Sequence, residues 1–172
     1  MKKKKGFTLI ELIVVIAIIG VLSAILVPVL IGYLAKSRIM TANTAARDIN
    51  TALSIALLDL SNAELHVEVL DSDYCYTMAE VDAAPDVHIG DIGPSDKAKM
   101  ENLLLKRIRE YFTSTRSMDS ISFHVTPDGT SGGVGVINRG YPGSYPIAIT
   151  PDDFRQKDSW DSDDALDFAM NH

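Results

Sequence analysis

Residues 6–12 read Gly-Phe-Thr-Leu-Ile-Glu-Leu, and they open an apolar run that continues to Ala35 with Glu11 as its only charged side chain. Four lysines, Lys2 to Lys5, precede the glycine. A membrane-spanning helix needs about 20 apolar residues, and residues 7–35 exceed that length. This stretch therefore predicts a transmembrane helix that carries an acid near its beginning.

Glu11 needs a partner, because a carboxylate within a membrane span costs roughly 2.5–3.5 kcal/mol on insertion scales and is read by default as functional. Cleavage of the chain between Gly6 and Phe7 would create an α-amine on Phe7 in the same apolar layer. Four helical residues separate that amine from Glu11 by about 6 Å along the axis, which makes pairing within one chain awkward. Pairing of Glu11 with the Phe7 amine of a neighbouring chain avoids this strain.

The leader and the motif resemble the class III signal of type IV pilins and pseudopilins, over residues 1–35. The resemblance implies that a prepilin peptidase cuts between Gly6 and Phe7 and methylates the new amino group of Phe7. It also implies that Glu11 contacts the Phe7 amine of an adjacent subunit during assembly. Gly20 and Pro28 fall where pilins commonly carry helix breakers, and Pro28 lacks a backbone donor. The resemblance therefore implies that the stretch between Gly20 and Pro28 loses helical order in a filament.

Two other kinds of N-terminal segment fit less well. A secretory signal has an apolar core of roughly 7–15 residues and a small-residue cut site, but residues 7–50 contain no Ala-x-Ala. A plain membrane anchor would have no use for Glu11 or for a glycine before an aromatic residue. The four leader lysines place the leader in the cytoplasm by the positive-inside rule, so the chain after residue 35 is expected outside.

The charge and the motif content exclude several functional classes. The chain has 16 basic and 23 acidic side chains, a formal net charge of −7, and removal of the four leader lysines leaves 12 against 23, or −11. Such an acidic surface does not favour nucleic-acid binding, which needs a basic stripe. The four histidines show no metal-ligand spacing, and no P-loop, dinucleotide or nucleophile-elbow motif occurs. The sequence therefore predicts neither an enzyme nor a firmly bound cofactor.

The apolar spacing after the span predicts an α+β fold. Residues 36–62 continue at helical spacing, so the transmembrane helix is expected to run on as an amphipathic half. We expect a pilin-like lollipop, in which this long helix packs on a small antiparallel sheet with an extra helix. The domains are then a basic leader (1–6), a transmembrane and assembly helix (7–35) and an exported globular domain (36–172). The positions that carry the amphipathic pattern are Ile39, Ala42, Ala46, Ile49, Leu53, Ala56, Leu57 and Leu60.

The remaining segments are read from local patterns. Residues 63–94 are expected to be irregular, with a short strand over 65–69. Helical spacing predicts a second helix over 96–113 with Ser95 as its N-cap. Alternation predicts a strand over 121–125, a turn at 127–129, a return strand over 134–137 and a third strand over 146–150.

Three features of the exported domain are candidate sites. A group of aspartates near the carboxy terminus could hold Ca²⁺ through hard oxygen ligands, although we favour a solvated acidic tail. Cys75 is the only cysteine, so the carboxy-terminal disulfide common in the family is not possible, and Cys75 is expected to be a small buried residue. Four aromatic residues could form a glycan-stacking patch, although core anchors are favoured. The aspartates are Asp158, Asp161, Asp163, Asp164 and Asp167, and the aromatics are Tyr141, Tyr145, Phe154 and Trp160.

These observations predict a structural subunit of a type IV pilus that serves motility, adhesion or DNA uptake. The expected partners are other pilin subunits, the prepilin peptidase, the assembly platform with its ATPase, and the membrane. The subunit is expected in the cytoplasmic membrane before assembly and in a surface pilus afterwards. Two alternatives stay open: a pseudopilin of type II secretion or competence, and a membrane-anchored ion- or glycan-binding module that never polymerises.

Overall fold

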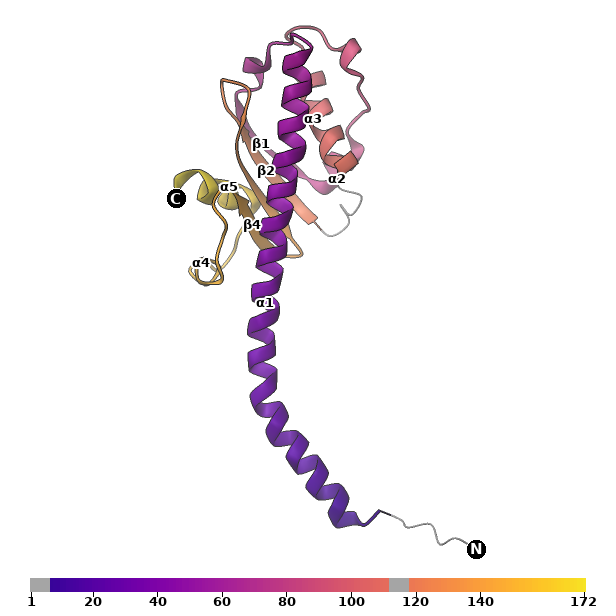
Figure 1. Ribbon diagram of the computed structural model, residues 1–172, viewed down its shortest axis with the longest axis vertical. Coiled ribbons are helices and arrows are strands. Elements are labelled where there is room, and N and C mark those ends of the chain that lie inside the picture. Colours follow the sequence, from indigo (N-terminus) through magenta and orange to yellow (C-terminus); the bar gives the residue numbers. More distant parts are fainter. Residues whose placement is uncertain (1–6, 112–117) are drawn as a thin grey trace, which may run out of the picture. The chain divides into compact units, whose positions relative to one another are not determined.

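The computed structural model describes residues 7–111 and 118–172 of the chain (Figure 1). The chain divides into two compact units, Met1–Ser37 and Arg38–His172, and helix α1 (Leu9–Asn62) contributes residues to both. The lysine leader, Gly6 and the predicted helix end at 112–113 lie outside the described residues.

The second unit combines helices with one antiparallel sheet of four strands, in the spatial order β1-β2-β3-β4. The α+β class, with a long helix packed on an antiparallel sheet, is thereby confirmed. The predicted hairpin is also confirmed, because β2 and β3 pair antiparallel with Phe123 opposite Val134. In chain order after α1, the elements are η1 (Val67–Leu70), β1 (Ser72–Thr77), α2 (Met78–Ala83), η2 (Ile89–Asp91), α3 (Lys97–Tyr111), β2 (Met118–Val125), β3 (Ser131–Asn138), β4 (Tyr141–Tyr145), α4 (Pro151–Arg155) and α5 (Ser162–Asn171).

The part of α1 within the second unit buries the apolar stripe predicted from its spacing. All eight predicted positions are buried, each with at most 2% of its surface exposed. Seven of them pack in the main core against the sheet residues Ile121, Phe123 and Val136 and against α3, while Ile39 belongs to a smaller cluster. Figure 1 shows the strands passing behind this part of the helix. Burial of such a stripe, at about 25 cal/mol per Å² of apolar area, supplies the main stabilising term of the unit.

The backbones of α1 and β4 approach each other very closely at Gly143. A Cβ placed on Gly143 would lie 2.1 Å from the Ala42 carbonyl carbon and 2.4 Å from the Asn43 nitrogen. The adjacent Asn43 side chain fastens the same contact: its Oδ1 accepts from Ser144 N at 3.0 Å and from Ile149 N at 3.2 Å, and its Nδ2 donates to Ile149 O at 2.8 Å. Gly143 and Asn43 together therefore fix where the helix lies on the sheet.

Helix α5 covers the other face of the sheet, so the carboxy terminus is a packed helix and not a tail, although four of the five aspartates are exposed as expected. A Cβ on Gly135 of β3 would lie 2.3 Å from both Leu166 N and Ser162 O. Ala165 and Leu166 of α5 are buried. The capping box of Asp161 and Asp164 starts α5: Asp161 Oδ1 accepts from Asp164 N at 2.8 Å, and Asp164 Oδ2 accepts from Asp161 N at 3.1 Å. Asp161 and Asp164 thus begin a helix, and this helix was not predicted because the run of charged residues was interpreted as a tail.

Two predicted strands are wrong, and in both cases the backbone groups bond elsewhere. In the stretch 65–69, His66 N donates to Pro94 O at 2.8 Å and Val69 N to His66 O at 3.2 Å, giving the 3₁₀ turn η1. In the stretch 146–150, the Asn43 side chain takes both backbone groups of Ile149, so the segment does not join the sheet. The last strand is instead β4, in the glycine- and proline-containing segment that lies between the two predicted strands 134–137 and 146–150.

The N-terminus of α3 also differs from the prediction in its cap. Asp96 Oδ1 accepts from Lys99 N at 3.3 Å, the bond expected of an N-cap side chain. Ser95 Oγ instead lies 3.0 Å from His66 Nδ1. Ser95 therefore joins α3 to the turn after α1, and Asp96 takes the capping role.

The buried Tyr74 makes the stability of the second unit sensitive to alkaline pH. Its hydroxyl donates to Leu70 O at 3.0 Å, and burial, with a smaller contribution from the nearby Glu101, raises its pKa well above the ordinary 10.0. An acid whose pKa is raised by folding keeps its proton in the native state and loses it in the unfolded state, so stability falls as the pH rises through the unfolded pKa.

We therefore expect the free energy of unfolding to decline above about pH 10. Tyr74→Phe should lose stability at about pH 8, because the bond to Leu70 is removed, but it should decline less steeply above about pH 10. Urea unfolding of both proteins at the two pH values measures this. Equal alkaline losses in the two proteins would contradict the assignment to Tyr74.

Candidate functional site: the N-terminal assembly segment

Thr8 and Glu11 form a reciprocal cap at the start of α1. The Glu11 Oε2 accepts from Thr8 N at 2.8 Å and from Thr8 Oγ1 at 2.7 Å, while Glu11 N donates to Thr8 Oγ1 at 3.3 Å. This is the capping box in which a Thr and a Glu three residues later satisfy each other's backbone donors. This cap was not predicted from the sequence, although Thr8-Leu9-Ile10-Glu11 carries the Thr-x-x-Glu spacing.

The cap leaves one Glu11 oxygen available. Both bonds from Thr8 end on Oε2, and among the described residues no hydrogen bond to Oε1 is found. Glu11 is exposed, and the adjacent Phe7 is 84% exposed. The carboxylate is therefore positioned and half-satisfied by its own chain, and it can accept a further donor from outside.

The first unit consists of a helix whose large apolar side chains have no partners within the described chain. Each large apolar residue from Phe7 to Leu34 is at least 46% exposed. By length and composition α1 can cross a membrane. Such a surface requires either lipid or other apolar helices around it.

Gly20 and Pro28 lie inside α1, and the helix includes both. A Cβ on Gly20 would meet no atom within 4 Å, so nothing within the described chain demands a glycine there. Pro28 removes one backbone donor from the helix and its ring crowds the preceding turn. The loss of helical order between these two residues stays a prediction about the assembled state.

The five carboxy-terminal aspartates serve several local structures. Asp161 and Asp164 cap α5, the Asp164 carboxylate pairs with Lys157, and Asp163 Oδ1 accepts from the buried Ser122 hydroxyl at 2.5 Å. The Lys157 ammonium holds the pKa of Asp164 below its usual value. Within residues 7–111 and 118–172, no group of three or more His, Cys, Asp or Glu side chains converges to hold a metal ion. Calcium binding at Asp158, Asp161, Asp163, Asp164 and Asp167 stays a sequence-based prediction without a convergent ligand set.

The aromatic residues mostly act as packing anchors, as favoured from sequence. Tyr141 lies against Phe154 with ring centroids 5.5 Å apart, and Trp160 packs edge-on to Phe168 at 6.1 Å. These four surround the small cluster of Ile39, Ile149 and Ala165, while Tyr145 packs on the main core. Cys75 differs from expectation, since it is exposed on β1, with its Sγ 3.7 Å from Ser162 Oγ. Alternation along β1 turns Tyr74 inward and Cys75 outward.

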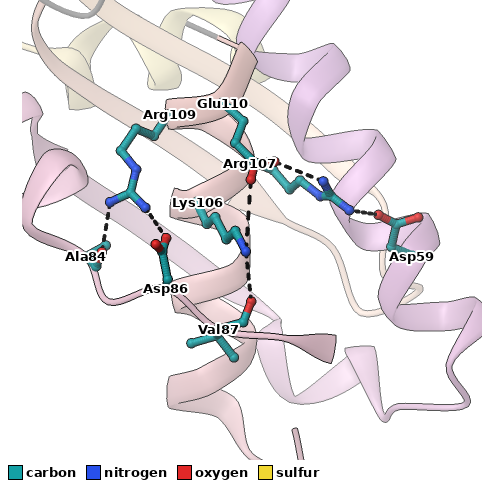
Figure 2. Close-up of polar contacts among 8 residues, drawn as sticks. All are labelled: Asp59, Ala84, Asp86, Val87, Lys106, Arg107, Arg109 and Glu110. Carbon is teal, nitrogen blue, oxygen red and sulfur yellow. Dashed lines mark hydrogen bonds and ion pairs between the residues drawn. The ribbon is translucent and has the colours of Figure 1, made fainter. Parts of the chain in front are cut away.

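A pocket of about 340 Å³ lies between the end of α1 and α3. Figure 2 shows that its basic side chains are already engaged: Arg107 binds the Asp59 carboxylate at 2.7 Å and Glu110 at 2.9 Å, and Lys106 Nζ donates to Val87 O at 3.3 Å. The neighbouring Arg109 pairs with Asp86 and donates to Ala84 O at 2.9 Å. These contacts hold α3 against α1 and against the loop that precedes α3. The polar groups of the pocket therefore serve packing between these elements.

The similarity of this chain to known proteins lies mainly in its N-terminal segment. Residues 1–27 match the family described as the prokaryotic N-terminal methylation motif. The chain is 43% identical over 61 residues to a type IV major fimbrial protein FimA of Dichelobacter nodosus, covering 36% of this chain and 38% of that protein. It is 44% identical over 59 residues to a fimbrial protein of Pseudomonas aeruginosa, covering 34% and 38%. No solved structure matches the chain.

A longer alignment reaches into the second unit. The FimA of D. nodosus strain VCS1703A is 31% identical over 107 residues, covering 57% of this chain and 66% of that protein. The chain thus spans little more than a third of the length of the first relatives and less than two thirds of this one. The chain carries the N-terminal methylation motif and is similar, mainly over its N-terminal part, to type IV fimbrial proteins.

Proposed function

We propose that this protein is a structural subunit of a type IV pilus, polymerised through its N-terminal helix. The observation that carries the proposal is the combination of a capped, half-satisfied Glu11 with an apolar helix that has no partner within its own chain. The relatives are named as fimbrial proteins, which supports a structural rather than a catalytic role.

Processing precedes assembly in this proposal. The prepilin peptidase cuts between Gly6 and Phe7 and methylates the Phe7 amine, and the match to the methylation motif supports this step. The subunit then resides in the cytoplasmic membrane with α1 as its span. The assembly platform and its ATPase move it into a surface filament.

Glu11 selects the register of the incoming subunit. Thr8 occupies Oε2, so Oε1 is free to accept from the Phe7 amine of the neighbouring subunit. A misplaced subunit leaves the acid and the amine unpaired in an apolar layer, which is strongly destabilising. Helix packing supplies the bulk of the filament contact, and this charge pair fixes its axial position. The stretch between Gly20 and Pro28 adapts to its neighbours by losing helical order.

A pseudopilin of secretion or competence would use the same N-terminal chemistry, so it stands beside the pilin as the near alternative. The alternative from a different class is a membrane-anchored module that never polymerises. In the described residues, the aspartates do not converge as a metal site and most of the candidate aromatics pack against the small cluster, so the ion site and the glycan patch expected of that module are not preformed.

Shearing of cells that have a working assembly machine separates these functions. We expect the chain in the sheared filament fraction, and its absence there when the assembly ATPase is deleted. A chain that stays monomeric in the membrane of cells with the intact machine would overturn the proposal in favour of the anchored module.

A further inference from the structure

The basic side chains of the second unit fall into two groups. Those of α3 and of the carboxy-terminal region all make ion pairs with carboxylates: Lys97, Lys99, Lys106, Arg107, Arg109, Arg155 and Lys157. Among the described residues of this unit, Arg38, Arg47 and Arg139 have no carboxylate partner, although acidic side chains outnumber basic ones in the chain. Arg47 is exposed and lines none of the described pockets, whereas Arg38 and Arg139 lie together. Both line one pocket of about 240 Å³, together with Thr41 and Asn138.

The two arginines are held in place by different elements. Arg38 lies on α1 with its guanidinium 5.3 Å from the centroid of the Tyr141 ring, a stacking contact that leaves the edge donors of the guanidinium available. Arg139 lies in the two-residue turn between β3 and β4, where Asn138 is paired with Tyr141. Gly140 N donates to Asp119 Oδ2 at 2.9 Å and fixes this turn.

Arg139 has an unfavourable backbone conformation for its residue type. Its φ is +51° and that of Gly140 is +75°, the pattern of a two-residue hairpin turn that favours Asn or Asp before Gly. A bulky residue in this region is strained, and such strain points to a function for the side chain that occupies the position. Arginine at position 139 makes the turn less stable than Asn or Asp would, but it places a cation in the same pocket as Arg38.

The position of Arg38 along α1 suggests which anion it meets. The apolar run ends at Ala35, and three helical residues advance the chain by only about 4.5 Å. Tyr33, 69% exposed, is the kind of aromatic residue enriched where a span meets the headgroups, and Lys36 follows it. A subunit that resides in a bilayer therefore carries Arg38 in the headgroup layer.

We propose that the pocket of Arg38, Thr41, Asn138 and Arg139 binds the headgroup phosphate of an anionic phospholipid. The inference rests on the membrane residence in the proposed function. Arginine presents paired donors that match phosphate oxygens, and basic residues near an anionic surface gain binding energy from it. The bound lipid holds the second unit at the bilayer until the subunit is extracted for assembly.

The test uses the full chain in neutral detergent, with bound lipid counted by native mass spectrometry during titration of phosphatidylglycerol or phosphatidylcholine. We expect phosphatidylglycerol to bind at least about fivefold more tightly, the factor that one basic residue contributes near such a surface. The double variant Arg38→Gln/Arg139→Asn should lose this preference. Asn suits the turn at 139, so the variant should keep or raise its thermal midpoint, which separates lost binding from misfolding.

Arg47→Gln/Arg155→Gln is the matched control, because it removes the same charge from exposed positions outside the pocket, and it should keep the preference. Equal loss in the control, or no preference in the wild type, would overturn the proposal. Glycerol phosphate at equal concentration should not displace the lipid, and full displacement would instead assign the pocket to a soluble anion. Flotation with phosphatidylcholine vesicles tests membrane residence separately: a chain that does not float overturns the proposed function and this inference together, whereas one that floats without headgroup preference overturns only the inference.

Discussion

Gly143→Ala is expected to destabilise the second unit by about 3 kcal/mol, at the upper end of what overpacking in a core costs. The added methyl would meet the Ala42 carbonyl carbon at 2.1 Å, the Ala42 oxygen at 2.3 Å and the Asn43 nitrogen at 2.4 Å. All three are backbone atoms of a helix, so no side chain can rotate away. Relief requires α1 to move off β4, which also breaks the three Asn43 hydrogen bonds.

Urea unfolding of the full chain in detergent, followed by the near-ultraviolet signal of the buried aromatics, measures this loss. Gly90→Ala is the control, since a Cβ there would meet no atom within 4 Å, and it should change stability by less than about 0.5 kcal/mol. Similar stabilities for the two variants would mean that the helix does not lie against β4 as described.

Glu11→Ala is expected to reduce filament yield at least about tenfold while membrane insertion and cleavage continue. A tenfold change corresponds to about 1.4 kcal/mol, and an unpaired buried amine costs at least that much. Insertion itself should become easier, because removal of an intramembrane carboxylate recovers roughly 2.5–3.5 kcal/mol. Sheared filament protein, normalised to cleaved chain in the membrane, is the measurement.

A pair of further variants separates the two roles of Glu11. Glu11→Gln can keep the capping box, because Gln serves at that position, but it removes the charge and should lose filaments as Glu11→Ala does. Thr8→Ala removes the cap and keeps the carboxylate, and it should cost the helix only about 1 kcal/mol and leave filaments largely intact. Normal filaments from Glu11→Gln, with few from Thr8→Ala, would make capping the function of Glu11 and contradict the pairing of charges.

The sequence predicted the long helix and the β2–β3 hairpin because in both the burial pattern is carried by the chain itself. The stripe from Ile39 to Leu60 recurs at helical spacing, and Ile121, Phe123 and Val125 alternate with polar residues. Each pattern reports one face turned toward the core, whatever covers it. Such elements are recognisable without knowledge of their partners.

The elements that were missed depend on contacts from distant segments. Strand β4 contains Pro142 and Gly143, which are uncommon inside strands, so no strand was predicted there. The need for glycine at position 143 comes from the close approach of the Ala42 backbone. The alternation around Ile147 and Ile149 suggested a strand, but Asn43, more than 100 residues earlier, takes the backbone groups of Ile149. Helix α5 was hidden by its aspartates, although the Asp161 and Asp164 spacing is a capping signal that could have been recognised.

The candidate functional residues also fall into those that the sequence could predict and those that it could not. The roles of Phe7, Glu11 and the cleavage position were predicted from a contiguous motif, and the Thr8 cap could have been predicted from the same residues. The sequence could not have predicted that Arg38 and Arg139 line one pocket, because the pocket forms only when the β3–β4 turn lies beside the start of the second unit.

The mass of the mature N-terminal peptide from sheared surface filaments shows whether the chain is processed and polymerised as proposed. We expect a filament subunit that begins with N-methylated Phe7 and lacks residues 1–6. A filament-free preparation, with uncut chain confined to the membrane fraction of cells that carry a working peptidase and assembly machine, would contradict this expectation.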